Sequence, residues 1–132
     1  AQLENAQKIY DNRMHSWNLY YELLSDLEKQ GFIELPKVPE GCVHNAHMFY
    51  IKTKDLKERT SLIHYLKGNG INSVFHYIPL HSSPAGKRLG EFRGEDKYTT
   101  CESERLLRLP LYYGLDPESI NYIVECIKKF YN

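Results

Sequence analysis

The stretch VFHYIPLH, from Val74 to His81, holds two histidines and a tyrosine within eight residues. Imidazole and phenol groups can donate and accept hydrogen bonds, and imidazole can also move protons or bind a metal. On a strand, His76 would share one face with Val74, and Tyr77 would take the other face. His76 also stands close to Pro79 and a long loop, where binding groups often gather. The residue types leave two interpretations open: a binding histidine, or a histidine held in a core or between domains.

A second group, Cys42, His44 and His47, has the spacing C-x-H-x-x-H and could supply metal ligands. Structural zinc sites usually combine two separated pairs of ligands. No second pair is evident, because Cys101 and Cys126 each stand alone. We therefore interpret this segment as the entry to a strand, with no metal site expected, and a metal analysis would test the alternative.

The sequence contains neither the motif of a catalytic serine nor that of a phosphate-binding loop. Ser82 and Ser83 follow His81 directly, but neither lies in the strained G-x-S-x-G turn that exposes a catalytic serine. The glycines of SSPAGKRLG do not have the spacing of a phosphate-binding loop. The basic residues around this segment are interpreted as a solvated face: Lys87, Arg88 and Arg93.

The length is that of one domain, and the composition gives no net charge. The 132 residues include 17 Lys and Arg and 17 Asp and Glu, so no net field favours nucleic acid or an anionic membrane. The 3 cysteines are far apart and odd in number, which favours a reducing, cytoplasmic compartment over a disulfide framework. No apolar run approaches the roughly 20 residues of a membrane span.

Apolar residues recur at helical spacing from Leu3 to about Gln30, and Gly31 is suited to end that helix. The prolines and glycine of residues 34–41 then predict an extended connector. The chain also starts without Met, inside this helical pattern, so we expect it to be a piece of a longer protein.

The remaining sequence alternates between strand and helix patterns. Strands are predicted at 46–53, 73–78 and 108–113, the last at an edge or a bulge because of Pro110. Asp55, Thr99 and Asp116 are predicted to cap three helices, and residues 80–98 to form a long loop. The fold class is α/β, in a two-layer α+β arrangement. A small, mainly antiparallel sheet carries helices on one face, and a long N-terminal helix precedes it.

Tyrosine is unusually frequent, with 11 copies. Its apolar ring and polar tip suit half-buried surfaces, so a face that meets another domain or subunit is one interpretation and a tyrosine-rich core margin is the other. We expect the chain to expose a patch rimmed by tyrosines, or to cover that patch by self-association.

Several long strings resemble one enzyme family in order along the whole chain. They are HNAHMFYIKTKDLKERTSLIHYLK, FHYIPLHSSPAG and GEFRGEDKYTTCESERLLRLPLYY, together with QLEN and RMHSWNLYYELL near the N-terminus. These strings are similar to the sugar-nucleotide aminotransferases of the DegT/DnrJ/EryC1/StrS type, which use pyridoxal phosphate (PLP). The resemblance is more specific than any single motif above.

The resemblance implies the C-terminal small domain of a fold-type-I aminotransferase, with residues 1–31 as an interdomain helix and residues 32–132 as the domain itself. The intact enzyme would bind PLP, a sugar nucleotide and L-glutamate, and would be a homodimer with an N-terminal large domain. Nothing here resembles the segment with the Schiff-base lysine, so no catalytic residue is expected in this chain and no cofactor is expected on it. The implied substrate-side residues are His76, Tyr77, His81, Asn45 and His47.

An alternative from another functional class is a stand-alone binding or interaction module with the same small-domain fold, because fold does not fix function. An upstream reading frame that encodes the cofactor lysine would distinguish the two.

Overall fold

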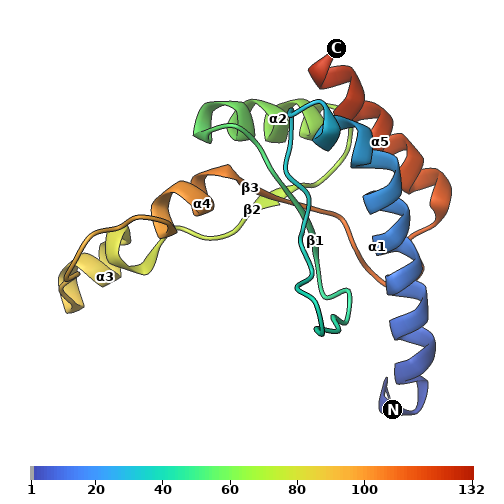
Figure 1. Cartoon of the computed structure of the whole chain (residues 1–132), viewed down its shortest axis with the longest axis horizontal. Coiled ribbons are helices and arrows are strands. Elements are labelled where there is room, and N and C mark those ends of the chain that lie inside the picture. Colours follow the sequence, from blue (N-terminus) through green and yellow to red (C-terminus); the bar gives the residue numbers. More distant parts are fainter. Residues whose placement is uncertain (1) are drawn as a thin grey trace.

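A computed structural model describes residues 2–132 as a three-stranded antiparallel sheet with helices packed against it (Figure 1). The strand order is β1-β3-β2, and α5 contacts both α1 and α2. This arrangement confirms the predicted fold class. The elements in chain order are η1 (Gln2–Asn5), α1 (Ala6–Lys29), β1 (Phe49–Lys52), α2 (Leu56–Gly68), β2 (Val74–Phe75), η2 (Leu80–Ser82), α3 (Pro84–Leu89), α4 (Thr99–Arg105), β3 (Leu106–Leu109) and α5 (Pro117–Tyr131).

The long first helix is confirmed from Ala6 onward, and its C-terminal half carries the buried stripe. Trp17, Tyr20 and Leu24 are buried, whereas Leu3 lies in η1 and is 88% exposed. Gly31 follows the helix with φ of 79°, a conformation that glycine adopts without steric cost. None of the helices within residues 2–132 is long and apolar enough to cross a membrane.

Two of the three predicted helix caps are confirmed. Asp55 accepts a hydrogen bond from the Glu58 amide at 2.9 Å, and Asp116 accepts one from the Ser119 amide at 2.7 Å. The predicted cap at Thr99 is wrong, because the side chain of Asp96 accepts from the Thr100 amide instead. An aspartate further upstream therefore begins α4.

The strands are shorter than predicted, and the prediction for the third strand is wrong in position. β3 ends before Pro110 and pairs with both neighbours, so it is the central strand and not an edge. β2 stops at Phe75, which pairs with Leu107 near the start of β3, and α4 ends at Arg105 directly before β3. His76 consequently lies just beyond the end of the ladder.

The core lies between one sheet face and the helices. Phe49, Ile51 and Leu107 point toward it and are fully buried. Tyr20 of α1 stacks on Phe49 with ring centroids 5.0 Å apart, and its hydroxyl donates to the Pro110 carbonyl at 3.0 Å. Full burial of such a side chain contributes about 1.5–3 kcal/mol. The sheet is therefore fixed to α1 by packing and by a hydrogen bond.

Residues 76–105 form an arm that extends away from this core and holds η2, α3 and α4 (Figure 1). None of its residues is buried. The prediction of a long loop at 80–98 is wrong for residues 80–89, because η2 lies there, Ser83 accepts from the Gly86 amide and Pro84 begins α3. A Cβ at Gly86 would lie 1.7 Å from the Leu80 carbonyl oxygen, so this turn requires glycine.

Candidate functional site

The outer face of the sheet, opposite the core, carries the polar side chains of the strands. Arg108 of β3 pairs with Tyr50 of β1 on one side and with Val74 of β2 on the other. Tyr50 and Arg108 are half-buried, whereas Val74 is exposed. Directly paired residues share a face, so these three side chains lie side by side where β2 leads into the arm.

His76 lies at this junction and contacts Arg108. Arg108 Nη1 is 3.1 Å from Nδ1 and 3.2 Å from Nε2 of the His76 ring. Partial burial lowers the pKa of His76, and the charges of Arg108 and His47 lower it further. His76 therefore favours its neutral form, in which one ring nitrogen can accept a hydrogen bond from the guanidinium.

Tyr77 follows His76 and is largely exposed, with its ring centroid 3.7 Å from that of His76. Both residues line an open hollow of about 510 Å³ between the start of the arm and α4. Thr99, Glu102 and Ser103 line its other side. The hollow combines an apolar wall from residues 78–80 with hydroxyl, phenol, carboxylate and imidazole groups, which suits a polar ligand with a ring.

His81 lies apart from this hollow and is already partnered. Its Nε2 is 3.0 Å from Asp96 Oδ2 and 3.3 Å from Thr100 Oγ1, and its ring packs on Phe92. It lines a separate hollow with Leu89. The structure thus does not bring His81 together with His76, and its predicted role at the substrate stays a prediction.

Asn45 and His47 lie in the turn before β1. Asn45 Oδ1 accepts from the His47 amide at 3.1 Å, and Arg13 of α1 donates to the carbonyls of Ala46 and His47. The His47 charge is one of those that lower the pKa of His76. His47 is therefore an electrostatic neighbour of His76, whereas the Asn45 side chain forms the turn itself.

Cys42 and His44, the other two residues of the C-x-H-x-x-H group, have different surroundings. The His44 ring lies against Trp17 with centroids 4.4 Å apart, and its Nδ1 accepts from the Ala46 amide. Cys42 is exposed. Across residues 2–132, no three His, Cys, Asp or Glu side chains are grouped so that they could hold a metal.

Four charged residues form an ion-pair network on the same side of the sheet. Lys52 pairs with Glu102 and, at 3.9 Å, with Glu34; Arg105 pairs with both of these carboxylates. The Arg105 hydrogen bond lowers the pKa of Glu34, and the Glu102 hydrogen bond raises that of Lys52. These charges are mutually compensated, so Lys52 is not a free amine.

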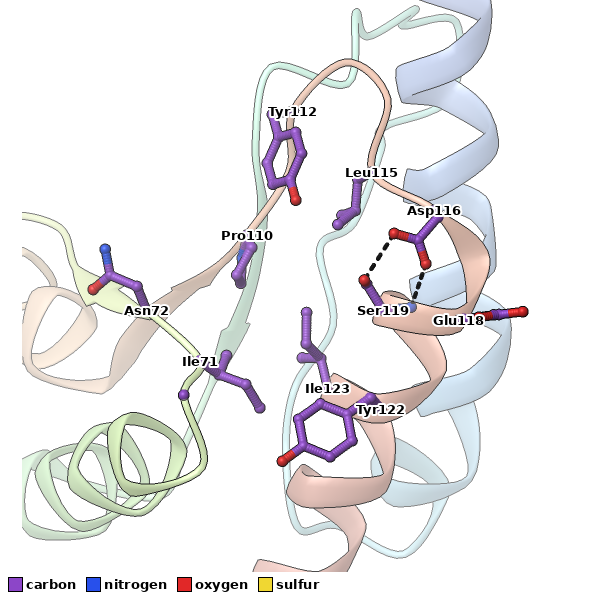
Figure 2. A pocket seen from close by; sticks show the side chains of 11 residues that line it. Ile71, Asn72, Pro110, Tyr112, Leu115, Asp116, Glu118, Ser119, Tyr122 and Ile123 are labelled. Carbon is purple, nitrogen blue, oxygen red and sulfur yellow. Dashed lines mark hydrogen bonds between the residues drawn. The ribbon is translucent and has the colours of Figure 1, made fainter.

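A larger pocket of about 900 Å³, which the sequence did not predict, lies away from all these residues (Figure 2). The buried side chains of Ile71, Leu115 and Ile123 point into the space between two half-exposed tyrosines, Tyr112 and Tyr122. The Asp116 carboxylate at its edge is used to cap α5.

Comparison with known proteins gives the family. The profile of the DegT/DnrJ/EryC1/StrS aminotransferases matches residues 1–128. The chain belongs to the DegT/DnrJ/EryC1/StrS aminotransferase family. This family is of the PLP-dependent type and includes sugar aminotransferases, so the resemblance in the sequence is confirmed at the level of the family.

The chain is similar to curated proteins and solved structures of this family over one part of their length. It is 32% identical to the pleiotropic regulatory protein of Geobacillus stearothermophilus over 73% of this chain and 25% of that protein. It is 28% identical to the GDP-perosamine synthase of Vibrio cholerae over 100% of this chain and 35% of that protein. The structure of a DegT/DnrJ/EryC1/StrS aminotransferase from Brucella abortus has a TM-score of 0.80 and 25% identity, over 97% of this chain and 32% of that one. The chain thus spans about a third or less of these relatives.

The residues around the hollow beside His76 do not fit PLP, the cofactor that this aminotransferase family implies. The cofactor needs a lysine amine as its covalent attachment. No lysine lines the hollow beside His76, and Lys52 is held between two carboxylates. These side chains can contact a substrate, but they do not provide the cofactor site.

Proposed function

We propose that this chain is the C-terminal part of a PLP-dependent aminotransferase that acts on a sugar nucleotide. The family match and the coverage of about a third of each relative support this proposal. A longer N-terminal part would hold PLP and its lysine, α1 would bridge the two parts, and two copies would form the enzyme. The chain alone would be inactive.

The observation that carries the proposal is the position of His76 and Tyr77. They lie in an open hollow just after the end of β2, and their side chains can donate hydrogen bonds to sugar hydroxyls or phosphate. In our account they form one wall of the substrate cleft and orient the sugar nucleotide, while His47 and Arg108 shape the charge around them.

We propose a more specific reaction from the strings quoted above, which look most like dTDP-4-amino-4,6-dideoxygalactose transaminase. The amino group of L-glutamate would move to C4 of dTDP-4-keto-6-deoxyglucose, and the product would serve the synthesis of enterobacterial common antigen or a related cell-surface polysaccharide. Cytoplasmic sugar-nucleotide metabolism is consistent with this reaction.

The proposal is tested first with the chain alone. The 132-residue chain is mixed with PLP, L-glutamate and dTDP-4-keto-6-deoxyglucose, and the amino sugar is assayed by mass spectrometry. We expect no product, and turnover by the chain alone would contradict the assignment of catalysis to another part.

The second test uses the longer protein that the gene encodes. His76→Ala should raise KM for the sugar nucleotide by about tenfold or more, since it removes hydrogen bonds to a polar substrate. Arg93→Ala, in an exposed pair with Glu91, is the matched control and should leave KM unchanged. Equal kinetic constants in the His76 variant and the control would reject the site.

A further inference from the structure

Arg108 differs from two basic residues nearby, Lys52 of β1 and Arg105 at the end of α4, in lacking a carboxylate partner among residues 2–132. Lys52 and Arg105 are both neutralised by Glu34 and Glu102. Arg108 forms no ion pair with any residue from 2 to 132, and its guanidinium contacts the His76 ring instead. A guanidinium carries a permanent positive charge, so this part of the outer face holds one uncompensated cation.

His76 positions this cation without neutralising it. The lowered pKa of His76, caused by partial burial and then by Arg108 and His47, favours a neutral ring that accepts from Nη1. Arg108 also lies on the central strand, where pairing on both sides fixes its backbone. The backbone of Arg108 is therefore fixed by pairing, and its guanidinium has one contact, with the His76 ring.

The guanidinium also has unused donors. Nε of Arg108 is buried and has no hydrogen-bond partner among the described residues, and Nη1 is the one guanidinium nitrogen that contacts another side chain within residues 2–132. Unpaired donors on a charged group cost free energy. A planar fork with several free N–H groups matches the two oxygens of a carboxylate or a phosphate better than any neutral ligand.

We propose that Arg108, positioned by His76, binds an oxyanion on the outer face of the sheet. Within the proposed function, on which this assignment of the ligand rests, the oxyanion comes from one of two sources. It is a phosphate of the sugar nucleotide or a carboxylate of L-glutamate. Two ionic hydrogen bonds from the fork fix the orientation of the anion beside the hollow of His76 and Tyr77.

The test is a titration of the isotope-labelled chain followed by NMR, with inorganic pyrophosphate and L-glutamate as separate probes at constant ionic strength. We expect pyrophosphate or L-glutamate to shift the Arg108 side-chain resonance and the His76 ring resonances. Arg108→Gln should weaken that binding by about tenfold or more, and Arg108→Lys, which keeps the charge but loses the fork, by less. Arg93→Gln removes an equal charge from an exposed pair and should change nothing.

The outcomes distinguish a phosphate from a carboxylate ligand, and they test the oxyanion site separately from the proposed function. Binding of pyrophosphate assigns the phosphate, and binding of L-glutamate assigns the carboxylate. Equal binding by the wild type, Arg108→Gln and Arg93→Gln would overturn the oxyanion site, as would the absence of binding by either probe in chains whose spectra remain folded. The KM effect of His76→Ala in the longer protein does not depend on these probes, so the proposed function stands or fails separately.

Discussion

Nε2 of His81 lies 3.0 Å from Oδ2 of Asp96, and this pair closes the outer loop of the arm. His81 belongs to η2 and Asp96 lies just before α4, so the contact joins the two sides of the segment that contains α3. Asp96 also accepts hydrogen bonds from the amide and hydroxyl of Thr100. The arm buries no side chain, so these polar contacts have a large share in its order.

Asp96→Ala should loosen the arm without unfolding the core. It removes the partner of His81 and the acceptor at the start of α4, and neither contact reaches the sheet. Hydrogen exchange should become several-fold faster in residues 80–105 and stay unchanged in α5. Glu95→Ala, whose side chain is exposed and pairs with Lys97, is the control. Unchanged exchange in the arm would contradict this role of Asp96.

Acid should loosen the arm in the same way. The hydrogen bonds from the Thr100 hydroxyl and amide, followed by the charge of His81, lower the pKa of Asp96 below its ordinary value of 3.8. A carboxyl with a lowered folded-state pKa stabilises the fold above its ordinary pKa, and that contribution is lost as pH falls through the folded-state value. The protection of arm amides, measured relative to their intrinsic exchange rate at each pH, should therefore fall below about pH 4, and this fall should be absent in Asp96→Ala.

The pKa of His76 should lie below its ordinary value of 6.5. Partial burial is the largest cause and the charge of Arg108 the next, so Arg108→Gln should move the pKa upward. Titration of the ring resonances by NMR measures both values. Because the folded-state pKa is lowered, any stabilisation that depends on neutral His76 is present above pH 6.5 and decreases as pH falls through the folded-state value. A His76 pKa at or above 6.5 would contradict the neutral ring inferred from its contact with Arg108.

Tyr20→Phe should destabilise the core by about 1–2 kcal/mol, because the half-buried Pro110 carbonyl would lose its donor. The ring packing on Phe49 would remain. Urea denaturation measures the change in the free energy of unfolding. Tyr21→Phe, on the more exposed side of α1, should change it by less than about 0.5 kcal/mol. Equal stability of the two variants would show that the hydrogen bond to Pro110 contributes little.

Trypsin should cut the arm before the core. Its exposed basic residues lie in α3 and in the loop after it, namely Lys87, Arg88, Arg93 and Lys97. Proteases cleave exposed segments that open at little cost in free energy. Mass spectrometry of early digests should find the first cuts at these residues. First cuts within α1 or α5 would contradict the division into an open arm and a stable core.

Local chemistry made the helices predictable, and long-range pairing made the strands less so. Asp55 and Asp116 cap their helices through contacts three residues away, which the sequence shows directly. The length of β2 depends on where β3 begins, and the central place of β3 depends on two partners. Ser83 followed by Pro84 was a readable signal for α3 that the sequence analysis did not use.

The candidate site was predictable only in part for the same reason. The motif around His76 and Tyr77 stands out in the sequence, and in the structure both residues line the same hollow. Arg108 has no such motif around it. Its contact with His76 follows from strand order, which places residues 32 positions apart next to each other. The many tyrosines do not share one environment. Tyr20 is fully buried in the core, whereas Tyr77 and Tyr98 on the arm are each 74% exposed.

The central claim, that His76 and Tyr77 form a wall of a sugar-nucleotide site, is tested most directly by locating the bound substrate. The labelled chain is titrated with dTDP-4-amino-4,6-dideoxygalactose, and amide and ring shifts are mapped on the structure. Our account predicts that the largest shifts fall at His76, Tyr77 and their neighbours in the hollow, and that His76→Ala reduces them. Shifts confined to the pocket between Tyr112 and Tyr122, or binding that His76→Ala leaves unchanged, would contradict it.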